Sequence, residues 1–259
     1  MITAVIVSYN TGDVLFDTIK SLKNNKHISQ IIIVNNGNPE GFLDNIKDAE
    51  IISGHGNIGF AKGCNLGAKH VKTDYVLIIN PDCVLSDDFD FTEMLEDLKE
   101  PHILCATCKI ENLDGSEQRG SRRRFLTPFN IFRGINLNKT PLPDKKVFIE
   151  ATSGAFMLFT KEDYFRLGGF DEEYFLHVED LDLCMKIRQI GGKLIYYPYK
   201  YVRHTCSTSD APKIFVERHK LNGFDYYFGK FFGKNLLTIT ILLLLKLRFT
   251  LKSLHLAKK

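Results

Sequence analysis

The 259-residue sequence lacks an apolar run long enough to cross a bilayer. Its longest largely apolar stretch, Leu236–Leu245, is about ten residues, whereas a spanning helix needs about 20. We also expect no signal peptide, because the N-terminus enters "ITAVIVSY" without a basic segment or a cleavage site. With 44% apolar and 25% charged residues, the composition is that of a soluble globular protein, and we expect a reducing, cytoplasmic compartment.

The sequence is equally poor in cysteine pairs suited to disulfides or zinc. Its six cysteines are scattered through a chain large enough to fold without disulfides. Cys105 and Cys108 form a C-x-x-C inside the apolar run "ILCATCKI", and residues three apart on a strand face opposite sides. Because no second pair supplies further ligands, we expect neither a metal nor a redox role for them.

Acidic residues are missing from the C-terminal segment of the chain. The net charge of +3 is modest and gives no reason to expect nucleic-acid binding. From Tyr226 to Lys259, however, there are seven Lys and Arg and no acid, so the remainder of the chain sums to −4. The C-terminal segment therefore differs in character from the rest of the protein.

Strands and helices alternate in the first third of the chain. Short β-branched runs such as "ITAVIVSY" are typical of strands buried on both faces of a parallel sheet. Such a doubly wound α/β sheet binds ligands beyond the carboxyl ends of its strands, and three of these ends are polar: "SYN", "NNG" and "NPD". The predicted strands are 2–9, 30–37, 49–53 and 74–82, with helices over 57–70 and after Asp13, a predicted N-cap that precedes Leu15, Ile19 and Leu22 on one face.

The remainder of the chain is less regular. The segment "ENLDGSEQRGSRRRF" predicts a turn followed by a basic segment, and 126–146, with three prolines and little periodicity, predicts a mobile loop. The other predicted elements are helices over 88–99, "KEDYFRLGG" and "EDLDLCMKIRQIGG", and strands over 103–110, 147–160 and "KLIYYPYKYVRH".

The stretch "GHGNIGF" contains a literal G-x-G-x-x-G, formed by Gly54, Gly56 and Gly59, which suggests a dinucleotide site. Its context argues against that interpretation. The fingerprint follows the third predicted strand rather than the first, and Asp74 precedes the next strand instead of ending it. We therefore do not expect a nicotinamide cofactor.

Acids and one histidine lie at predicted strand and helix ends. Asp82 and His204 each end a strand, and together they suit Mg²⁺ or Mn²⁺ with a diphosphate completing the shell. On position alone, a turn acid and a surface histidine are the simpler interpretation. Asp180 is a predicted N-cap, with Glu179 beside it and Asp182 as a solvated first-turn acid. An N-cap also holds a carboxylate in a fixed position, as a general base requires.

Eight stretches resemble, in order over residues 4–209, the inverting family 2 glycosyltransferases of the GT-A fold. The rhamnosyltransferase-like branch, which builds bacterial surface polysaccharides such as O-antigen or capsule, is the most similar. Each stretch alone is weakly specific, whereas the ordered set is highly specific. They are "VIVSYN", "IIIVNNG" (for V-D-N-G), "GNIGFAKGCNLGAK" (for N-x-G-F-x-x-x-x-N), "VLIINPDC" (for D-x-D), "SRRRF", "ATSGAFML", "GGFDEEYFLHVEDLDLCMKIR" and "VRHTCSTS".

The resemblance implies a fold and a role for each matching position. The fold would be α/β, a mostly parallel mixed sheet flanked by helices (residues 1–223), with an amphipathic helical tail (224–259). Asp180 would be the base, and Asp82 and His204 would hold the metal. Donor contacts would come from Ser8, Tyr9, Asn10, Asn35, Asn36, Gly37, Asn57, Gly59, Lys62, Asn65, Asn80 and Arg124, and acceptor contacts from Ser153, Gly154, Ala155 and Glu179.

Two positions depart from the family pattern. Asn35 stands where the family usually has the acid of V-D-N-G, which keeps a hydrogen-bonding side chain and loses a charge. Asn80 takes the first place of the D-x-D element, so only Asp82 remains as an acid. The expected donor is dTDP-rhamnose, and UDP- or GDP-sugars stay open.

The implied reaction is a single displacement onto a lipid-linked (polyprenyl diphosphate) or glycan acceptor. A catalytically silent sugar-nucleotide-binding assembly partner is the rival, and the joint presence of Asp82, Asp180 and His204 argues against it. A nucleotidyltransferase would need a basic Gly-rich loop after the first strand, where "SYNTGD" has no Lys or Arg.

We expect the apolar, basic tail to lie on an anionic membrane surface, at the inner face of the cell membrane. Packing of the tail on the catalytic domain, or on a second subunit in a homodimer, is the alternative.

Overall fold

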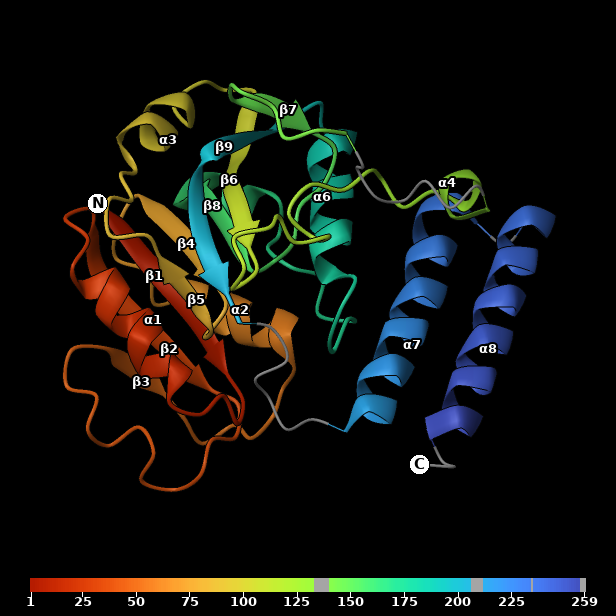
Figure 1. Ribbon diagram of the computed structural model, residues 1–259, viewed down its shortest axis with the longest axis horizontal. Coiled ribbons are helices and arrows are strands. Elements are labelled where there is room, and N and C mark those ends of the chain that lie inside the picture. Colours follow the sequence, from red (N-terminus) through yellow and green to blue (C-terminus); the bar gives the residue numbers. More distant parts are fainter. Residues whose placement is uncertain (133–139, 206–211, 234, 257–259) are drawn as a thin grey trace.

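The computed structural model describes residues 1–132, 140–205, 212–233 and 235–256 (Figure 1). Within them the strands form one mixed sheet in the order β3-β2-β1-β4-β8-β6-β9-β5, with β7 paired to β9. The strands are β1 (Ile2–Ser8), β2 (Ile28–Asn35), β3 (Glu50–Ile52), β4 (Tyr75–Ile79), β5 (Cys83–Leu85), β6 (Ile103–Glu111), β7 (Val147–Ile149), β8 (Phe156–Thr160) and β9 (Lys193–His204).

The sheet is parallel from β3 to β4 and becomes mixed beyond it. β8 runs antiparallel to both β4 and β6, β6 and β9 are parallel, and β5 and β7 are antiparallel to β9. Strand β1 is buried along its whole length, as expected of a β-branched strand covered on both faces. The carboxyl ends of β1, β2 and β4 lie at one edge, so the predicted α/β fold is confirmed.

Helices cover both faces of the sheet. Leu15, Ile19 and Leu22 of α1, with Met94 of α3, close one core, whereas α2, α6 and α7 close the other. Cys105 and Cys108 belong to opposite cores, as the strand pattern predicted, and both are free thiols. The helices are α1 (Val14–Lys23), α2 (Phe60–Ala68), α3 (Thr92–Asp97), α4 (Pro128–Phe132), α5 (Lys161–Arg166), α6 (Glu179–Gln189), α7 (Lys213–Phe232) and α8 (Leu236–Leu256).

Several predicted boundaries differ from the structure. The predicted strand 147–160 is two strands, because residues 150–155 leave the ladder between β7 and β8. Strand β5 was not predicted, since its three residues directly follow Pro81 and Asp82. Asp13 occupies the N-cap position of α1 without a capping hydrogen bond from its side chain. The predicted loop 126–146 contains α4, and its residues 133–139 lie outside the described part of the chain.

The C-terminal segment is two helices rather than one. α7 begins at Lys213, so residue 223, the predicted end of the catalytic domain, lies inside it. Tyr227 and Phe228 of α7 are fully buried against α6, and α8 lies alongside α7 (Figure 1). Among the described helices, none combines the length and the apolarity needed to cross a membrane.

Candidate active site

Asp82 and His204 meet where β5 pairs with the end of β9. Cys83 is opposite His204 in this antiparallel pair, and Asp82 immediately precedes it. The Nε2 atom of His204 lies 3.1 Å from Oδ1 of Asp82, which is only 3% exposed. The sequence thus predicted two residues, 122 positions apart, that the fold brings into contact.

The spacing of this pair fits a divalent cation. Two neighbouring ligands of an octahedral Mg²⁺ or Mn²⁺ ion, each about 2.1 Å from the metal, lie about 3 Å apart. An imidazole nitrogen and a carboxylate oxygen are suitable donors for these ions. The thiol of Cys83 also lies within 4.8 Å of both ligand atoms, but it is soft and belongs to the apolar core. Asp82 and His204 are therefore the residues suited to hold a metal.

Asn80 joins this pair to the segment that follows β7. Its Nδ2 lies 3.2 Å from Nε2 of His204, and its backbone N–H donates to the carbonyl of Ala155 at 3.0 Å. Two residues from Ala155, the Ser153 hydroxyl accepts from the Ala155 N–H at 3.3 Å, which shapes the turn. The predicted acceptor residues 153–155 therefore border the candidate metal pair.

Asp180 lies on the other side of the same turn. Its Oδ2 accepts the backbone N–H of Gly154 at 3.2 Å, and its Oδ1 accepts that of Leu181 at 2.8 Å. Arg123 approaches Oδ2 to 3.7 Å, and the carboxylate remains 13% exposed. A Cβ at Gly154 would lie 3.3 Å from Phe60 and 3.6 Å from Cβ of Asp180, so a side chain there would crowd the carboxylate. Asp180 is thus oriented yet accessible.

The entry into α6 differs from the predicted N-cap. The helix begins at Glu179 and Val178 occupies the N-cap position, so Asp180 lies in the first turn and not at the cap. His177 and Val178 have φ angles of 69° and 76°. A β-branched residue with positive φ is strained, and such strain is concentrated at functional sites. The chain thus uses a costly backbone geometry to present Asp180.

The two acids beside Asp180 are both buried. Burial raises the pKa of Glu179 well above its ordinary range, and repulsion from Asp180 adds to the shift. Asp182, predicted to be solvated, is instead fully buried and accepts the hydroxyl of Tyr174 at 3.0 Å. That prediction was wrong because α7, which a local pattern does not reveal, covers this face of α6.

Lys230 of α7 bridges two acids of the segment that carries Asp180. Its Nζ lies 2.6 Å from Oδ2 of Asp171 and 2.6 Å from Oδ2 of Asp182. Burial lowers the pKa of Lys230, but the two hydrogen bonds outweigh it and the net shift is upward. The C-terminal helix is therefore fastened to the first turn of α6 by charge, as well as by its apolar face.

The ends of β1 and β2 form a polar turn. The Ser8 hydroxyl contacts Thr11 and Asn38, and the side-chain Oδ1 of Asn35 accepts the backbone N–H groups of Gly37 and Asn38 at 3.2 and 2.9 Å. A side-chain amide thus builds this turn. Tyr9 flanks Gly37, where a Cβ would lie 3.2 Å from the ring, and Asn10 has a φ of 45°.

Asn36 connects this turn to α2. Its Nδ2 donates to the carbonyl of Gly59 at 2.9 Å, and its Oδ1 is buried without a hydrogen-bond partner in the described part of the chain. Asn57 accepts the N–H of Gly59 at 3.1 Å, and Lys62 extends from the first turn of α2 into solvent. Asn65 is engaged elsewhere, since its amide bonds Tyr164 and both backbone groups of Phe170.

Arg124 is exposed at a cavity of about 330 Å³ that adjoins the Asp180 side of the site. Arg123 and Arg122 line it too, but Glu117 pairs with the Arg122 guanidinium at 2.8 and 2.7 Å. Arg123 was matched from the sequence only as part of "SRRRF", and neither Lys230 nor Gln118, which contacts His204, was singled out. Their partners lie far away in the chain, so no local pattern could reveal them.

Comparisons with known proteins show which sequences and which fold this chain resembles. The family model described as "Glycosyl transferase family 2" matches residues 3–164. Rhamnosyltransferase WbbL of Escherichia coli (strain K12) is 26% identical over 220 residues, covering 79% of this chain and 83% of that protein. The N-acetylglucosaminyl-diphospho-decaprenol L-rhamnosyltransferase of Mycobacterium tuberculosis (strain ATCC 25618 / H37Rv) is 22% identical over 237 residues, covering 79% and 76%. The crystal structure of GalNAc-T7 with UDP, GalNAc and Mn²⁺ superposes with a TM-score of 0.68 at 17% identity, covering 88% of this chain and 47% of that one.

Proposed function

The chain belongs to glycosyl transferase family 2, and from that membership we propose that it transfers a sugar from a nucleotide sugar to an acceptor hydroxyl, with inversion at the anomeric carbon. The donor is dTDP-rhamnose, and the acceptor is a lipid-linked or polysaccharide glycan of a bacterial surface polymer. The names of the two rhamnosyltransferase relatives support this choice of sugar, and the decaprenol-linked substrate of one supports the class of acceptor.

One observation carries the proposal. Asn80 connects the 153–155 turn to the Asp82–His204 pair, because its backbone bonds Ala155 and its side chain contacts His204. Gly154 of the same turn donates to Asp180. One short segment therefore links the candidate metal pair to the candidate base. A pair suited to a diphosphate-bound metal and a carboxylate suited to a base are what a displacement at a sugar diphosphate requires. A silent binding module would not need an oriented, accessible carboxylate.

Asp180 acts as the general base. Its carboxylate takes the proton of the acceptor hydroxyl while the acceptor oxygen bonds to the anomeric carbon. The bond from that carbon to the diphosphate oxygen breaks, and the nucleoside diphosphate leaves with the electron pair. The Gly154 and Leu181 N–H groups hold the carboxylate in place during the transfer.

Asp82 and His204 would hold the divalent metal, Mg²⁺ or Mn²⁺. Bound there, the metal supplies positive charge that stabilises the departing diphosphate. Arg124, exposed at its cavity, is placed to meet further negative charge of the donor.

The remaining donor and acceptor contacts follow the edge of the sheet. Ser8, Tyr9, Asn10 and the 35–37 turn would contact the nucleoside, and Glu179 with 153–155 would border the acceptor. The other proposed donor contacts are Asn57, Gly59, Lys62 and Asn80. Asn65 is not among them, because its amide binds Tyr164 and Phe170.

The donor can be identified by thermal shift. A ligand that binds only the native state raises its apparent stability, so dTDP-rhamnose with Mn²⁺ is expected to raise Tm more than UDP- or GDP-sugars do. A larger shift with a UDP-sugar would replace rhamnose as the proposed donor and leave the reaction class unchanged.

The role of Asp180 is tested by Asp180→Asn. This variant is expected to keep the fold and the donor-induced Tm shift, and to lose about 10²–10⁴-fold in transfer rate, the usual contribution of a general base. Glu173→Gln makes the same chemical change at an exposed position of the same segment and is the matched control. A folded, donor-binding Asp180→Asn protein with full transfer activity would remove Asp180 from the mechanism.

The α7–α8 pair would hold the enzyme on an anionic membrane at its cytoplasmic face. The outward side of α8 exposes Leu236, Leu243, Leu244 and Leu247, whereas Ile241 and Leu242 pack inward. Apolar side chains beside basic ones favour the interface of an anionic leaflet, where a polyprenyl-linked acceptor would lie.

Vesicle sedimentation tests this surface. Leu243→Asp with Leu247→Asp is expected to release the protein from phosphatidylglycerol vesicles, whereas Leu113→Asp, an equally exposed leucine in a hairpin of the catalytic domain, is not. Truncation at residue 223 is unsuitable, since it would remove the buried Tyr227 and Phe228. Equal binding of the double variant and the wild type would leave the tail as a packing element or a dimer contact.

A further inference from the structure

The side-chain amide of Gln118 makes two hydrogen bonds to His204, the last residue of β9. Its Oε1 lies 2.9 Å from Nδ1 of His204, and its Nε2 donates to the backbone carbonyl of the same residue at 2.8 Å. Gln118 is 86 positions from His204 in the chain, and nothing in the segment "DGSEQ" beyond its turn residues attracts notice. The contact exists only because the hairpin after β6 folds back over β9.

The orientation of this amide is set by its surroundings. Nε2 faces two carbonyl oxygens, those of His204 at 2.8 Å and Glu111 at 3.3 Å. An amide rotated by 180° would place Oε1 against both, and acceptors do not bond acceptors. Oε1 must therefore be the atom that faces the imidazole.

This orientation decides the tautomer of the imidazole. An amide oxygen only accepts, so Nδ1 of His204 must carry the hydrogen. In the neutral ring Nε2 is then the unprotonated nitrogen, and it lies 3.1 Å from Oδ1 of Asp82. Both atoms are acceptors, so only a cation shared between them, a proton or a metal ion, can join them. Asn80 agrees, because its Nδ2, a donor, lies 3.2 Å from the same Nε2.

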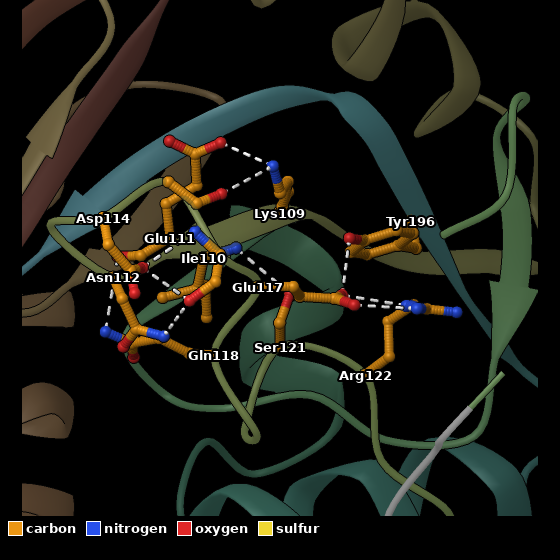
Figure 2. A network of polar contacts seen from close by, with 12 residues as sticks. Lys109, Ile110, Glu111, Asn112, Asp114, Glu117, Gln118, Ser121, Arg122 and Tyr196 are labelled. Carbon is orange, nitrogen blue, oxygen red and sulfur yellow. Dashed lines mark hydrogen bonds and ion pairs between the residues drawn. The ribbon is translucent and has the colours of Figure 1, made fainter. Parts of the chain in front are cut away.

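A network of charged and polar contacts keeps Gln118 in place. The Gln118 backbone N–H donates to Ile110 at 2.8 Å, and the Ser121 hydroxyl accepts the Ile110 N–H at 3.0 Å. Figure 2 shows the next anchor, Glu117, between Tyr196 and Arg122, with hydrogen bonds of 2.8, 2.8 and 2.7 Å. Gln118 thus sits beside a half-buried ion pair that restrains its backbone on both sides.

We propose that Gln118 is a positioning residue that fixes His204 as the Nδ1–H tautomer and thereby presents Nε2 to a divalent cation shared with Asp82. The metal part of this statement rests on the proposed function, whereas the tautomer part does not. Outer-shell partners of metal-bound histidines orient the ring and raise its affinity, and their loss costs about 10–100-fold in metal binding.

The first test is the tautomer itself in the metal-free protein. Two-bond ¹⁵N–¹H NMR spectra are recorded in a pH series up to the point at which the His204 ring is neutral, with His204 identified by its absence in His204→Asn. Wild type is expected to show hydrogen at Nδ1. Gln118→Met, similar in length and without polar atoms, is expected to shift the hydrogen toward Nε2.

The second test is Mn²⁺ affinity, measured by titration of the free protein without donor. Gln118→Met is expected to bind Mn²⁺ about 10–100-fold more weakly than wild type. Leu113→Gln, at the exposed tip of the same hairpin, controls for disturbance of the hairpin and is expected to match wild type.

Three results would overturn the inference. They are hydrogen at Nε2 in the wild type, an unchanged tautomer in Gln118→Met, and an unchanged Mn²⁺ affinity in that variant. A wild type with hydrogen at Nδ1 that binds no Mn²⁺ would instead refute the metal part of the proposed function and support the tautomer assignment.

Discussion

Lys230→Met removes the cation that α7 places between Asp171 and Asp182. Asp182 is fully buried, so the variant leaves a carboxylate in the interior without its 2.6 Å partner. Its remaining contacts are the Tyr174 hydroxyl at 3.0 Å and the ammonium of Lys186 at 3.8 Å. In the variant, Asp182 must therefore take up a proton, become exposed to water, or remain buried while α6 and α7 separate.

The expected cost follows from the burial of the two partners. Removing one member of a buried ion pair costs about 3–5 kcal/mol. The side chain of Lys230 is 27% exposed and Tyr174 remains, so we take the lower end, about 3 kcal/mol in the free energy of unfolding. For a chain of this size that corresponds to a decrease of about 6–12 °C in Tm.

The double variant Lys230→Met with Asp182→Asn separates charge from packing. It is expected to be more stable than Lys230→Met alone, because the amide keeps the Tyr174 contact and no longer buries a charge. Urea unfolding of wild type, both singles and the double closes the cycle and gives the coupling energy. Lys99→Met removes an exposed ion pair of the same 2.6 Å length and is expected to leave stability unchanged.

The same variant reports on the active site. Lys230 holds both ends of the 171–182 segment, which presents Asp180, and it touches no proposed donor residue. Lys230→Met is therefore expected to lower kcat while the donor-induced thermal shift stays the same. A loss of stability below about 0.5 kcal/mol, the range of ordinary surface substitutions, would refute a stabilising role for the contacts of Lys230 with Asp171 and Asp182. A double variant no more stable than Lys230→Met would refute the assignment of its cost to the buried charge.

Three further predictions concern single positions. Burial, with repulsion from Asp180, raises the folded pKa of Glu179 above its ordinary 4.5, so its contribution to stability is complete below 4.5 and is lost as pH rises through the folded pKa. The Tm difference between Glu179→Gln and wild type should therefore shift in favour of the variant as pH rises, and a difference that does not change with pH would contradict the assignment. Burial raises the folded pKa of Asp171, but the hydrogen bond from Lys230 outweighs burial and the net shift is downward. The contribution of Asp171 to stability is therefore present above its ordinary pKa of 3.8 and is lost as pH falls through its folded pKa. Thermal unfolding of Asp171→Asn should accordingly show the largest loss of stability near neutral pH and the smallest in acid. Gly59→Ala places a Cβ 2.5 Å from the Phe175 carbonyl oxygen, whereas Gly56 has a similar positive φ and open space around it. Thermal unfolding should therefore show a larger loss of stability for Gly59→Ala than for Gly56→Ala. Equal losses would mean that the positive φ alone is responsible.

Local sequence patterns predicted most strands of the sheet and pointed to two carboxylates, those of Asp82 and Asp180. The strands at the start of the chain were predictable because β-branched runs covered on both faces leave a continuous apolar signature. Asp82 stood out because a proline and an acid end such a run, and Asp180 because three acids interrupt an apolar segment at a helix start. These signals are local, and the family resemblance gave them roles.

Tertiary structure decided how those groups are held. Asp182 looked like a solvated first-turn acid until α7 covered it, and Lys230, 48 positions further on, neutralises it. His204 was predicted from the sequence as a metal ligand, whereas Gln118, which we propose fixes its tautomer, is 86 positions away in the chain. The split of the 147–160 strand, which places Gly154 against Asp180, likewise has no periodic signature. The sequence by itself singled out the residues proposed to carry the chemistry, because polar residues at strand and helix ends stand out in local patterns. Contacts between distant segments decided their orientation, burial and protonation, because these depend on which neighbours the fold places within hydrogen-bonding distance.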